Sequence, residues 1–272
     1  MNIITLKKGA AELDLSLRGG AALAWRIQGQ DLLYEDQAYR AGDSAVLSGG
    51  IPVLAPSCST GGDFRFEGRD YSLPMHGFVR DRIWTWDGRG AVDQAQLSYH
   101  HEGDQDFPFP FLLSLRYQLE EASLHIAIRC KNLGEGYLPF QFGLHPYLHR
   151  ASLFGTELPE ISPIQTWVDP FDAKLRYAYT GSADLLQCSS GYFAEGLESG
   201  QEVWRLQGPE AQLELRLGPD LRELIFWGPT RDFICAEPWT ARPLAHQSGE
   251  KLLHLAPGED WRSSFEMRLI QS

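Results

Sequence analysis

Two histidines and one glutamate carry the residue types that proton-transfer chemistry needs. His145 ends an apolar segment and precedes Pro146, and Glu237 ends another and precedes Pro238. Because proline stops regular strand pairing, each side chain should stand at a strand end, held firmly beside a groove. The apolar neighbours of Glu237 favour partial desolvation, which raises the pKa of a carboxyl above about 4.3. Together with His76, these residues predict a general acid–base site.

The other histidines are expected in structural or solvent-exposed positions. His100 and His101 are predicted in a polar loop, and His125 on the exposed face of a strand. His254 is expected beside a late strand. The acid–base hypothesis therefore depends on three residues from distant parts of the chain.

The elements that must position these residues are strands. Apolar residues alternate with polar ones along several segments, which is the pattern of a strand with one solvated face. The clearest examples are 11–17, 123–130, 212–217 and 265–269. Helical periodicity is scarce, and the best window, 31–37, is short. The sequence predicts an all-β fold, a large antiparallel β-sandwich of roughly 15 to 20 strands formed by residues 1–272 as one domain.

Turn residues punctuate these strands. Residues 66–71 predict a hairpin turn flanked by aromatic residues, and 132–136 separate two strand candidates, 124–131 and 137–144. Residues 48–62, Ser-Gly-Gly-Ile-Pro-Val-Leu-Ala-Pro-Ser-Cys-Ser-Thr-Gly-Gly, are too irregular for one strand. Such segments often form binding loops on a rigid scaffold, so Gly50 is predicted to border the substrate.

Composition excludes several classes of partner. The formal net charge is −12, and no run of five basic residues occurs, so we expect no nucleic-acid and no membrane partner. No stretch approaches 18 apolar residues, and the first fifteen residues lack the apolar core of a signal peptide. The four cysteines match no metal or redox motif. Free thiols and a cytoplasmic location are the expectation.

Four sequence blocks resemble the aldose 1-epimerase family of galactose mutarotase-like β-sandwich enzymes. They occur in the family order and span nearly the whole chain. The blocks are Gly49-Gly50-Ile51-Pro52-Val53-Leu54-Ala55-Pro56, His76-Gly77-Phe78-Val79-Arg80-Asp81, Gly143-Leu144-His145-Pro146-Tyr147 and Ala236-Glu237-Pro238-Trp239.

The resemblance implies a mutarotase acting on a sugar, with no cofactor and no metal. It implies that His145 is the general acid at the ring oxygen, that Glu237 is the base at the anomeric hydroxyl, and that His76 contacts the sugar near the ring oxygen. Ring opening to the aldehyde, rotation about C1–C2 and ring closure need only such an acid and base. Arg80 is a candidate donor to a hydroxyl or a phosphate, and Trp239 a candidate stacking platform.

The chain departs from the galactose enzymes at two places. Gly49-Gly50 stands where they carry an Asn-Arg pair, a form nearer the branch that includes hexose-6-phosphate mutarotases. A further substrate-binding Asp of those enzymes has no clear match; Asp169, Asp172 and Asp184 lie in a plausible region. These departures leave the preferred sugar open.

Three alternatives remain at the level of sequence. The first is a hexose-6-phosphate substrate, for which Arg65, Arg69, Arg80 and Arg242 are candidate phosphate ligands. The second is a non-catalytic carbohydrate-binding module on the same fold. The third is a zinc hydrolase that uses His76, His145 and Glu237 as ligands. The sequence predicts no particular oligomeric state.

Overall fold

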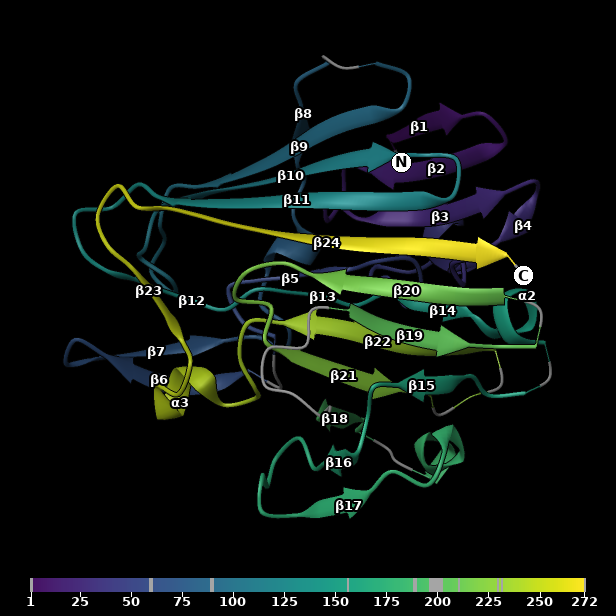
Figure 1. Cartoon of the computed structure of the whole chain (residues 1–272). Coiled ribbons are helices and arrows are strands. Elements are labelled where there is room, and N and C mark those ends of the chain that lie inside the picture. The colour runs from purple at the N-terminus through teal and green to yellow at the C-terminus, as the bar shows by residue number, and fades with distance from the viewer. Residues whose placement is uncertain are drawn as a thin grey trace.

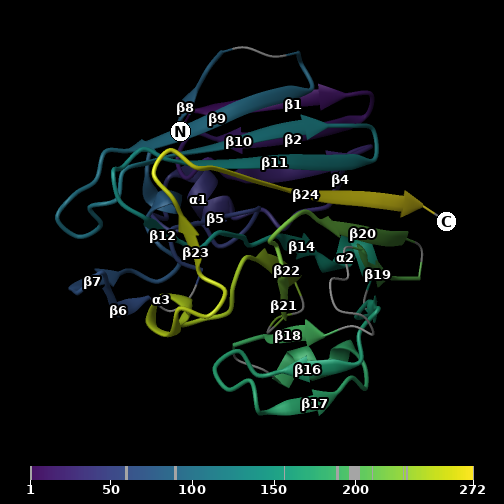
Figure 2. The same cartoon turned by 60° about the vertical axis from the view of Figure 1, so that its left-hand side comes forward.

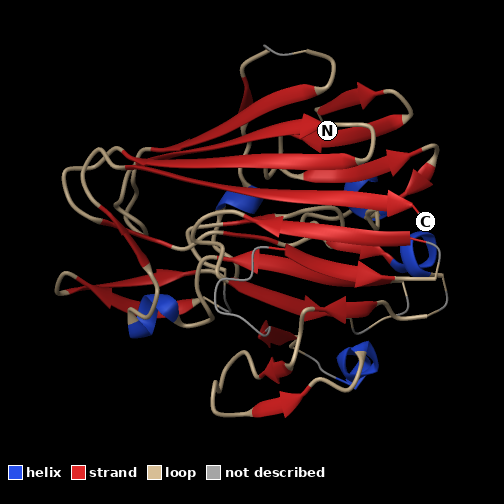
Figure 3. Cartoon of the chain, in the orientation of Figure 1, coloured by secondary structure: helices blue, strands red, loops and turns tan. Residues whose placement is uncertain are grey.

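The computed structural model describes residues 2–58, 61–88, 91–155, 157–187, 190–195, 203–209, 211–228, 230 and 232–271, without the side chains of 184, 186, 187 and 271. Strands account for 51% of the structure and helices for 8%, so the predicted all-β class is confirmed (Figure 3). The sandwich consists of two large antiparallel sheets with smaller sheets around them (Figure 1).

One eight-stranded sheet, here called the β11 sheet, forms the first layer. In spatial order it contains β15 (Glu160–Ser162), β19 (Val203–Gln207), β20 (Ala211–Leu217), β24 (Asp260–Gln271), β11 (Ser123–Asn132), β10 (Phe111–Leu119), β9 (Gln94–His101) and β8 (Thr85–Trp86). Side chains along β11 alternate between buried and half-buried, as the period-2 pattern of the sequence predicts.

The second large sheet, here called the β22 sheet, carries the predicted site. In spatial order it contains β17 (Arg176–Ala178), β16 (Thr166–Val168), β18 (Tyr192–Glu195), β21 (Glu223–Trp227), β22 (Phe233–Trp239), β13 (Gly143–Leu144) and β5 (Val53–Leu54), and β14 (Tyr147–His149) also pairs with β22. Ile234 and Ala236 join the main core that includes the β11 sheet. Ile225 and Trp239 belong to a second apolar cluster, because successive strand residues point to opposite faces.

Smaller elements complete the molecule (Figure 2). A four-stranded sheet contains β1 (Ile3–Lys8), β2 (Ala11–Ser16), β3 (Ala22–Ile27) and β4 (Gln30–Asp31). Two-stranded sheets pair β6 (Gly62–Phe66) with β7 (Arg69–Leu73) and β12 (Leu138–Phe140) with β23 (Leu253–Leu255). The helices are α1 (Gln37–Ala41), α2 (Arg150–Phe154), α3 (Ala245–Ser248) and the 3₁₀ turns η1 (Val79–Asp81) and η2 (Ser182–Gln187). In the described part of the chain, none is long and apolar enough to cross a bilayer.

Most strand predictions are confirmed. The segments 11–17, 123–130, 212–217 and 265–269 correspond to β2, β11, β20 and part of β24. The hairpin at 66–71 is the turn between β6 and β7. Cys58, Cys130 and Cys235 are buried free thiols, and Cys188 lies outside the described residues.

Two predictions about chain connections are wrong. The segment 132–136 does not connect two paired strands of a hairpin. Both edges of β11 already pair with β10 and β24, so the chain leaves the sheet after β11. The candidate strand 137–144 is two strands, β12 and β13, which pair in different sheets. Such breaks give 24 strands among the described residues, more than the sequence predicted.

Three local predictions also need correction. The helix expected at 31–37 is α1, which begins after Asp36, whose side chain accepts a hydrogen bond from the Tyr39 N–H. His100 and His101 lie in β9 rather than a loop, and His101 is buried. His254 is within β23. The prediction that residues 1–272 form one domain stays a prediction.

Candidate functional site

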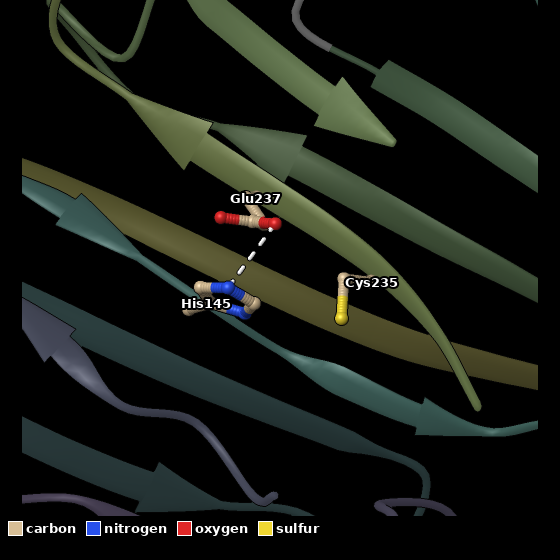
Figure 4. A group of neighbouring side chains, drawn as sticks. All are labelled: His145, Cys235 and Glu237. Carbon is tan, nitrogen blue, oxygen red and sulfur yellow. Dashed lines mark ion pairs between the residues drawn. The ribbon is translucent and has the colours of Figure 1, made fainter. Parts of the chain in front are cut away.

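Strand register brings the predicted acid and base together. In the pairing of β22 with β13 and β14, Trp239 lies opposite Gly143 and Cys235 lies opposite Tyr147. His145 and Glu237 are the midpoints of these two stretches, so they lie opposite each other. Since alternate residues of a strand share a face, Cys235, Glu237 and Trp239 point to the same side as His145. Figure 4 shows His145 and Glu237 in contact, with Cys235 beside them.

The contact between the His145 imidazole and the Glu237 carboxyl is close and buried. His145 Nε2 lies 3.3 Å from Glu237 Oε1, and the two residues are only 7% and 3% exposed. Burial raises the pKa of the Glu237 carboxyl well above its ordinary value. The neighbouring Trp239 indole opposes this shift of the pKa more weakly, and its Nε1 makes no hydrogen bond of normal geometry.

The imidazole of His145 is shifted in the opposite direction. Burial lowers its pKa well below the ordinary value, and the nearby His76 and Arg80 lower it further. A raised carboxyl pKa and a lowered imidazole pKa make Glu237 a stronger base and His145 a stronger acid than either is in water. Both shifts favour the uncharged forms of the two groups, a protonated carboxyl and a neutral imidazole, which suits reversible proton transfer in a buried site.

His76 stands at the edge of the pair. Its ring centroid is 5.8 Å from that of His145 and 6.2 Å from that of Trp239. Nδ1 donates a 3.0 Å hydrogen bond to the carbonyl oxygen of Cys58, which can only accept. Burial and the charge of Arg80 lower the pKa of His76 to about 4. At neutral pH, Nε2 is thus a hydrogen-bond acceptor, suited to a ligand hydroxyl.

Tyr147 is a site residue that the sequence interpretation missed. Its ring stacks on His145 with centroids 4.5 Å apart and planes 11° apart. The Trp227 ring meets His145 edge-on at 6.1 Å. Tyr147 lies two residues after His145, so strand alternation was the signal that could have identified it.

Gly50 holds the segment that carries Tyr147 in place through backbone hydrogen bonds. Its N–H donates to Tyr34 O, and its carbonyl accepts from the Tyr147 N–H, both at 2.8 Å. Its φ is +62°, and a Cβ there would lie 2.2 Å from Ala22 O, so only glycine fits. Both polar groups of Gly50 are used inside the protein, and its direct contact with substrate stays a prediction.

Gly143 makes room for the indole of Trp239. A Cβ on Gly143 would lie 2.6 Å from Trp239 Cδ1 and 2.8 Å from Cys58 Sγ. Trp239 is buried and also meets Phe193 edge-on at 6.0 Å. It is therefore packed beside Glu237 rather than spread on the surface as an open platform.

The candidate phosphate-binding arginines have different surroundings. Arg80 is 21% exposed, its Nε is buried without a hydrogen bond, and its nearest carboxylate, Asp81, is 3.9 Å away. Arg242 is held by Glu223 and Glu195 and lies over the Phe193 ring. Arg65 pairs with Asp70 on the exposed β6–β7 hairpin, which also carries Arg69. Of these four arginines, Arg80 is the one whose charge shifts the pKa of His76 and His145.

Two of the candidate aspartates make hydrogen bonds within a loop. Asp169 accepts hydrogen bonds from the backbone of Phe171 and Asp172, and Asp172 accepts from the backbone of Lys174. Both therefore stabilise the loop between β16 and β17. Asp184 lies in η2, and its side chain is outside the described residues.

One group of potential metal ligands occurs among the described residues. The ligand atoms of His145, Cys235 and Glu237 all lie within 4.8 Å of one another (Figure 4). Cys235 thus takes the place that the zinc-hydrolase alternative gave to His76. The mixture of imidazole, thiolate and carboxylate is one that zinc accepts.

Comparisons with known proteins agree with this fold and these motifs. A sequence model of the aldose 1-epimerase family matches residues 2–268. A protein of Cenchrus ciliaris named "Putative glucose-6-phosphate 1-epimerase" is 22% identical over 281 residues, which cover 95% of this chain and 82% of that protein.

Solved structures show the same architecture. The Slr1438 protein of Synechocystis sp. PCC 6803 is 28% identical with a TM-score of 0.88, and the match covers 100% of this chain and 96% of that one. A galactose mutarotase related enzyme of Lactobacillus acidophilus is 17% identical with a TM-score of 0.80, over 99% of this chain and 98% of that one. The predicted galactose mutarotase-like β-sandwich is therefore confirmed.

Proposed function

Because the chain belongs to the aldose 1-epimerase family, we propose that it interconverts the α and β anomers of a hexose-type sugar. The observation that carries the proposal is the buried His145–Glu237 contact of 3.3 Å. The anomeric and ring oxygens of a pyranose are bonded to the same carbon, so an acid and a base that reach both must themselves be close. The register of β22 against β13 and β14 supplies this closeness.

Ring opening moves two protons in opposite directions. The proton of the resting pair first passes from the Glu237 carboxyl to His145 Nε2. The Glu237 carboxylate then removes the proton of the anomeric hydroxyl, the C1–ring oxygen bond breaks, and His145 gives its proton to the ring oxygen. The products are an open-chain aldehyde, a neutral carboxyl and a neutral imidazole. The directions of the two pKa shifts favour this distribution.

Ring closure reverses these transfers on the other carbonyl face. After rotation about C1–C2, His145 accepts the proton of the ring hydroxyl while that oxygen attacks C1. Glu237 returns its proton to the carbonyl oxygen, which becomes the anomeric hydroxyl. His76 orients the sugar by accepting a hydrogen bond from a hydroxyl at Nε2. Trp239 supplies an indole N–H and an apolar edge beside Glu237.

Polarimetry of freshly dissolved α-glucose and α-galactose tests the proposal. We expect the protein to speed relaxation to the same final rotation that the sugar reaches alone. Exchange NMR extends the test to hexose 6-phosphates, whose anomers also interconvert spontaneously. If the protein binds these sugars and accelerates none of them, it is a carbohydrate-binding module and the proposed function is wrong.

A phosphorylated sugar is the second candidate substrate, and Arg80 is the observation that favours it. The charge of Arg80 lowers the pKa of both His76 and His145, and its ion pair with Asp81 is long at 3.9 Å, which suits an anionic substituent of the substrate. The Cenchrus ciliaris relative carries a glucose-6-phosphate 1-epimerase name, in agreement with this candidate.

Arg80→Gln should distinguish the two substrates. If phosphate binds here, the substitution raises KM for the hexose 6-phosphate about 10–100-fold, the value of a charge-assisted hydrogen bond, and barely changes KM for the neutral sugar. Initial-rate exchange NMR measures both values. Arg65→Gln, which removes an exposed ion pair with Asp70 and a hydrogen bond to the Gly68 carbonyl on the same hairpin, is the matched control and should change neither. Equal effects of Arg80→Gln on both sugars would contradict a phosphate-binding role.

Tyr147 is proposed to position His145 through ring stacking. Tyr147→Phe keeps the stack, so its kcat should stay close to that of the wild type. Tyr147→Leu removes an aromatic contact of about 0.5–1.5 kcal/mol and should lower kcat by up to about tenfold. NMR titration of the His145 imidazole should show its pKa rising in the Leu variant alone. Equal kcat and equal imidazole pKa in both variants would contradict this positioning role.

A further inference from the structure

The thiol of Cys235 has no part in the proposed mechanism, yet it lies beside both groups that do. Cys235 and Glu237 are two residues apart on β22 and share a face, and His145 comes from the neighbouring strand (Figure 4). All three residues are buried, and Cys235 forms no disulfide. Backbone pairing on both edges of β22 holds this segment in place. Cys235 pairs with Tyr147 of β14 on one edge and with Trp227 of β21 on the other.

The separations suit a small divalent cation. Zinc bonds of about 2.0–2.3 Å in tetrahedral geometry place neighbouring ligand atoms about 3.3–3.8 Å apart. His145 Nε2 and Glu237 Oε1 are already 3.3 Å apart, and all three ligand atoms lie within 4.8 Å of one another. Among the described residues, the Nδ1 atom of His145 has no hydrogen-bond partner, so a small tilt of the ring breaks no such bond there.

The donor set also selects among cations. A thiolate favours zinc and similar thiophilic metals, whereas magnesium and calcium prefer sites made only of oxygen. Binding of Zn²⁺ would displace the proton of the Cys235 thiol and the proton shared by Glu237 and His145. The resulting unit of one dication, one thiolate, one carboxylate and one neutral imidazole is electrically neutral, with a fourth position left for water.

We propose that His145, Cys235 and Glu237 form an inhibitory site for Zn²⁺ or a similar thiophilic divalent cation. The cation occupies the lone pairs through which the pair accepts protons, so the metal-bound protein cannot open a sugar ring. The inhibitory consequence rests on the proposed function, whereas binding of the cation does not.

A Co²⁺ titration of the full chain tests binding without an activity assay. Coordination of Co²⁺ by a thiolate gives a charge-transfer absorption band, which should appear in the wild type and in Cys58→Ala. Cys58 is the matched control because it is also a buried free thiol near Glu237. The band should be absent in Cys235→Ala. Isothermal titration of Zn²⁺ into Glu237→Gln, which removes a different ligand, should show weaker binding.

The inhibition assay then tests the consequence. Zn²⁺ should slow anomer exchange by the wild type, and excess chelator should restore the rate. Cys235→Ala should keep its basal rate and need at least about 10–100-fold more Zn²⁺ for half inhibition, since even loss of an outer-sphere partner costs that much affinity. A charge-transfer band that persists in Cys235→Ala, or the absence of any band in the wild type, would overturn the proposal. If the wild type showed the band but no epimerase activity, the metal site would stand and the proposed function would fail.

Discussion

Replacing Glu237 with glutamine is expected to lower kcat/KM for anomer interconversion about 10²–10⁴-fold, the usual contribution of one positioned acid or base. Glutamine keeps the size of the side chain and can still contact His145. It cannot accept the proton of the anomeric hydroxyl, so loss of activity would come from lost basicity rather than from a cavity. Exchange NMR, corrected for the spontaneous reaction, measures the change.

The same substitution should stabilise the folded protein. The folded state raises the pKa of Glu237 above its ordinary value of 4.5 because the carboxylate is buried. Above pH 4.5 the unfolded chain releases a proton that the folded chain retains, so the stability of the wild type falls as pH rises toward the folded pKa. Glutamine does not ionise. The gain in the free energy of unfolding should therefore grow with pH above 4.5, as measured by urea unfolding at several pH values.

Glu214→Gln is the matched control for both measurements. Glu214 is also buried on a strand, but it lies in β20 and forms ion pairs with Arg205 and Arg216. Its substitution should leave catalysis unchanged and lower stability. Retention by Glu237→Gln of more than a tenth of wild-type kcat/KM would show that Glu237 is not the base.

Replacing His145 with glutamine should reduce kcat/KM by a similar factor of about 10²–10⁴, because glutamine cannot deliver a proton to the ring oxygen. The folded state lowers the pKa of His145 below 6.5, so below pH 6.5 the unfolded chain takes up a proton that the folded chain does not. The wild type consequently loses stability as pH falls from 6.5. His145→Gln should lose less stability over this range in the same unfolding assay.

His101→Gln provides the comparison for His145. His101 is a buried histidine of β9 whose Nε2 donates to Phe107 O at 2.8 Å, in the sheet that does not carry the pair. We expect full activity from this variant once it is folded. Comparable activity losses in the two histidine variants would mean that folding, rather than proton transfer, explains the effect at His145.

The sequence and its family resemblance selected the proposed acid and base, but they did not show how the two side chains meet. The proline after His145 predicted correctly that this residue stands at a strand end, between β13 and β14. The same prediction for Glu237 is wrong, because β22 continues through Pro238 to Trp239 and pairs with β21 along this stretch. Their contact depends on the pairing of β22 with β13 and β14, which are distant in sequence. Local periodicity contains no information about which strands pair, so the 3.3 Å contact required the fold.

Two other residues beside the pair were missed for a different reason. Cys235 and Tyr147 each lie two residues from a selected residue and share its face, so strand alternation could have identified both. His101 was misplaced because Glu102 and Gly103 follow it and make the segment resemble a polar loop. In the structure its ring lies 5.2 Å from Phe111, in an aromatic cluster that no local pattern reveals.

The central claim is that Glu237 and His145 act as one unit, and a double-mutant cycle tests it most directly. Exchange NMR would give kcat/KM for the wild type, Glu237→Gln, His145→Gln and the double variant, with enough protein to exceed the spontaneous rate. Residues that act as a unit have strongly non-additive effects. We predict that the double variant is no more than a few-fold slower than the slower single variant. A loss in the double variant equal to the product of the two single losses would contradict the account.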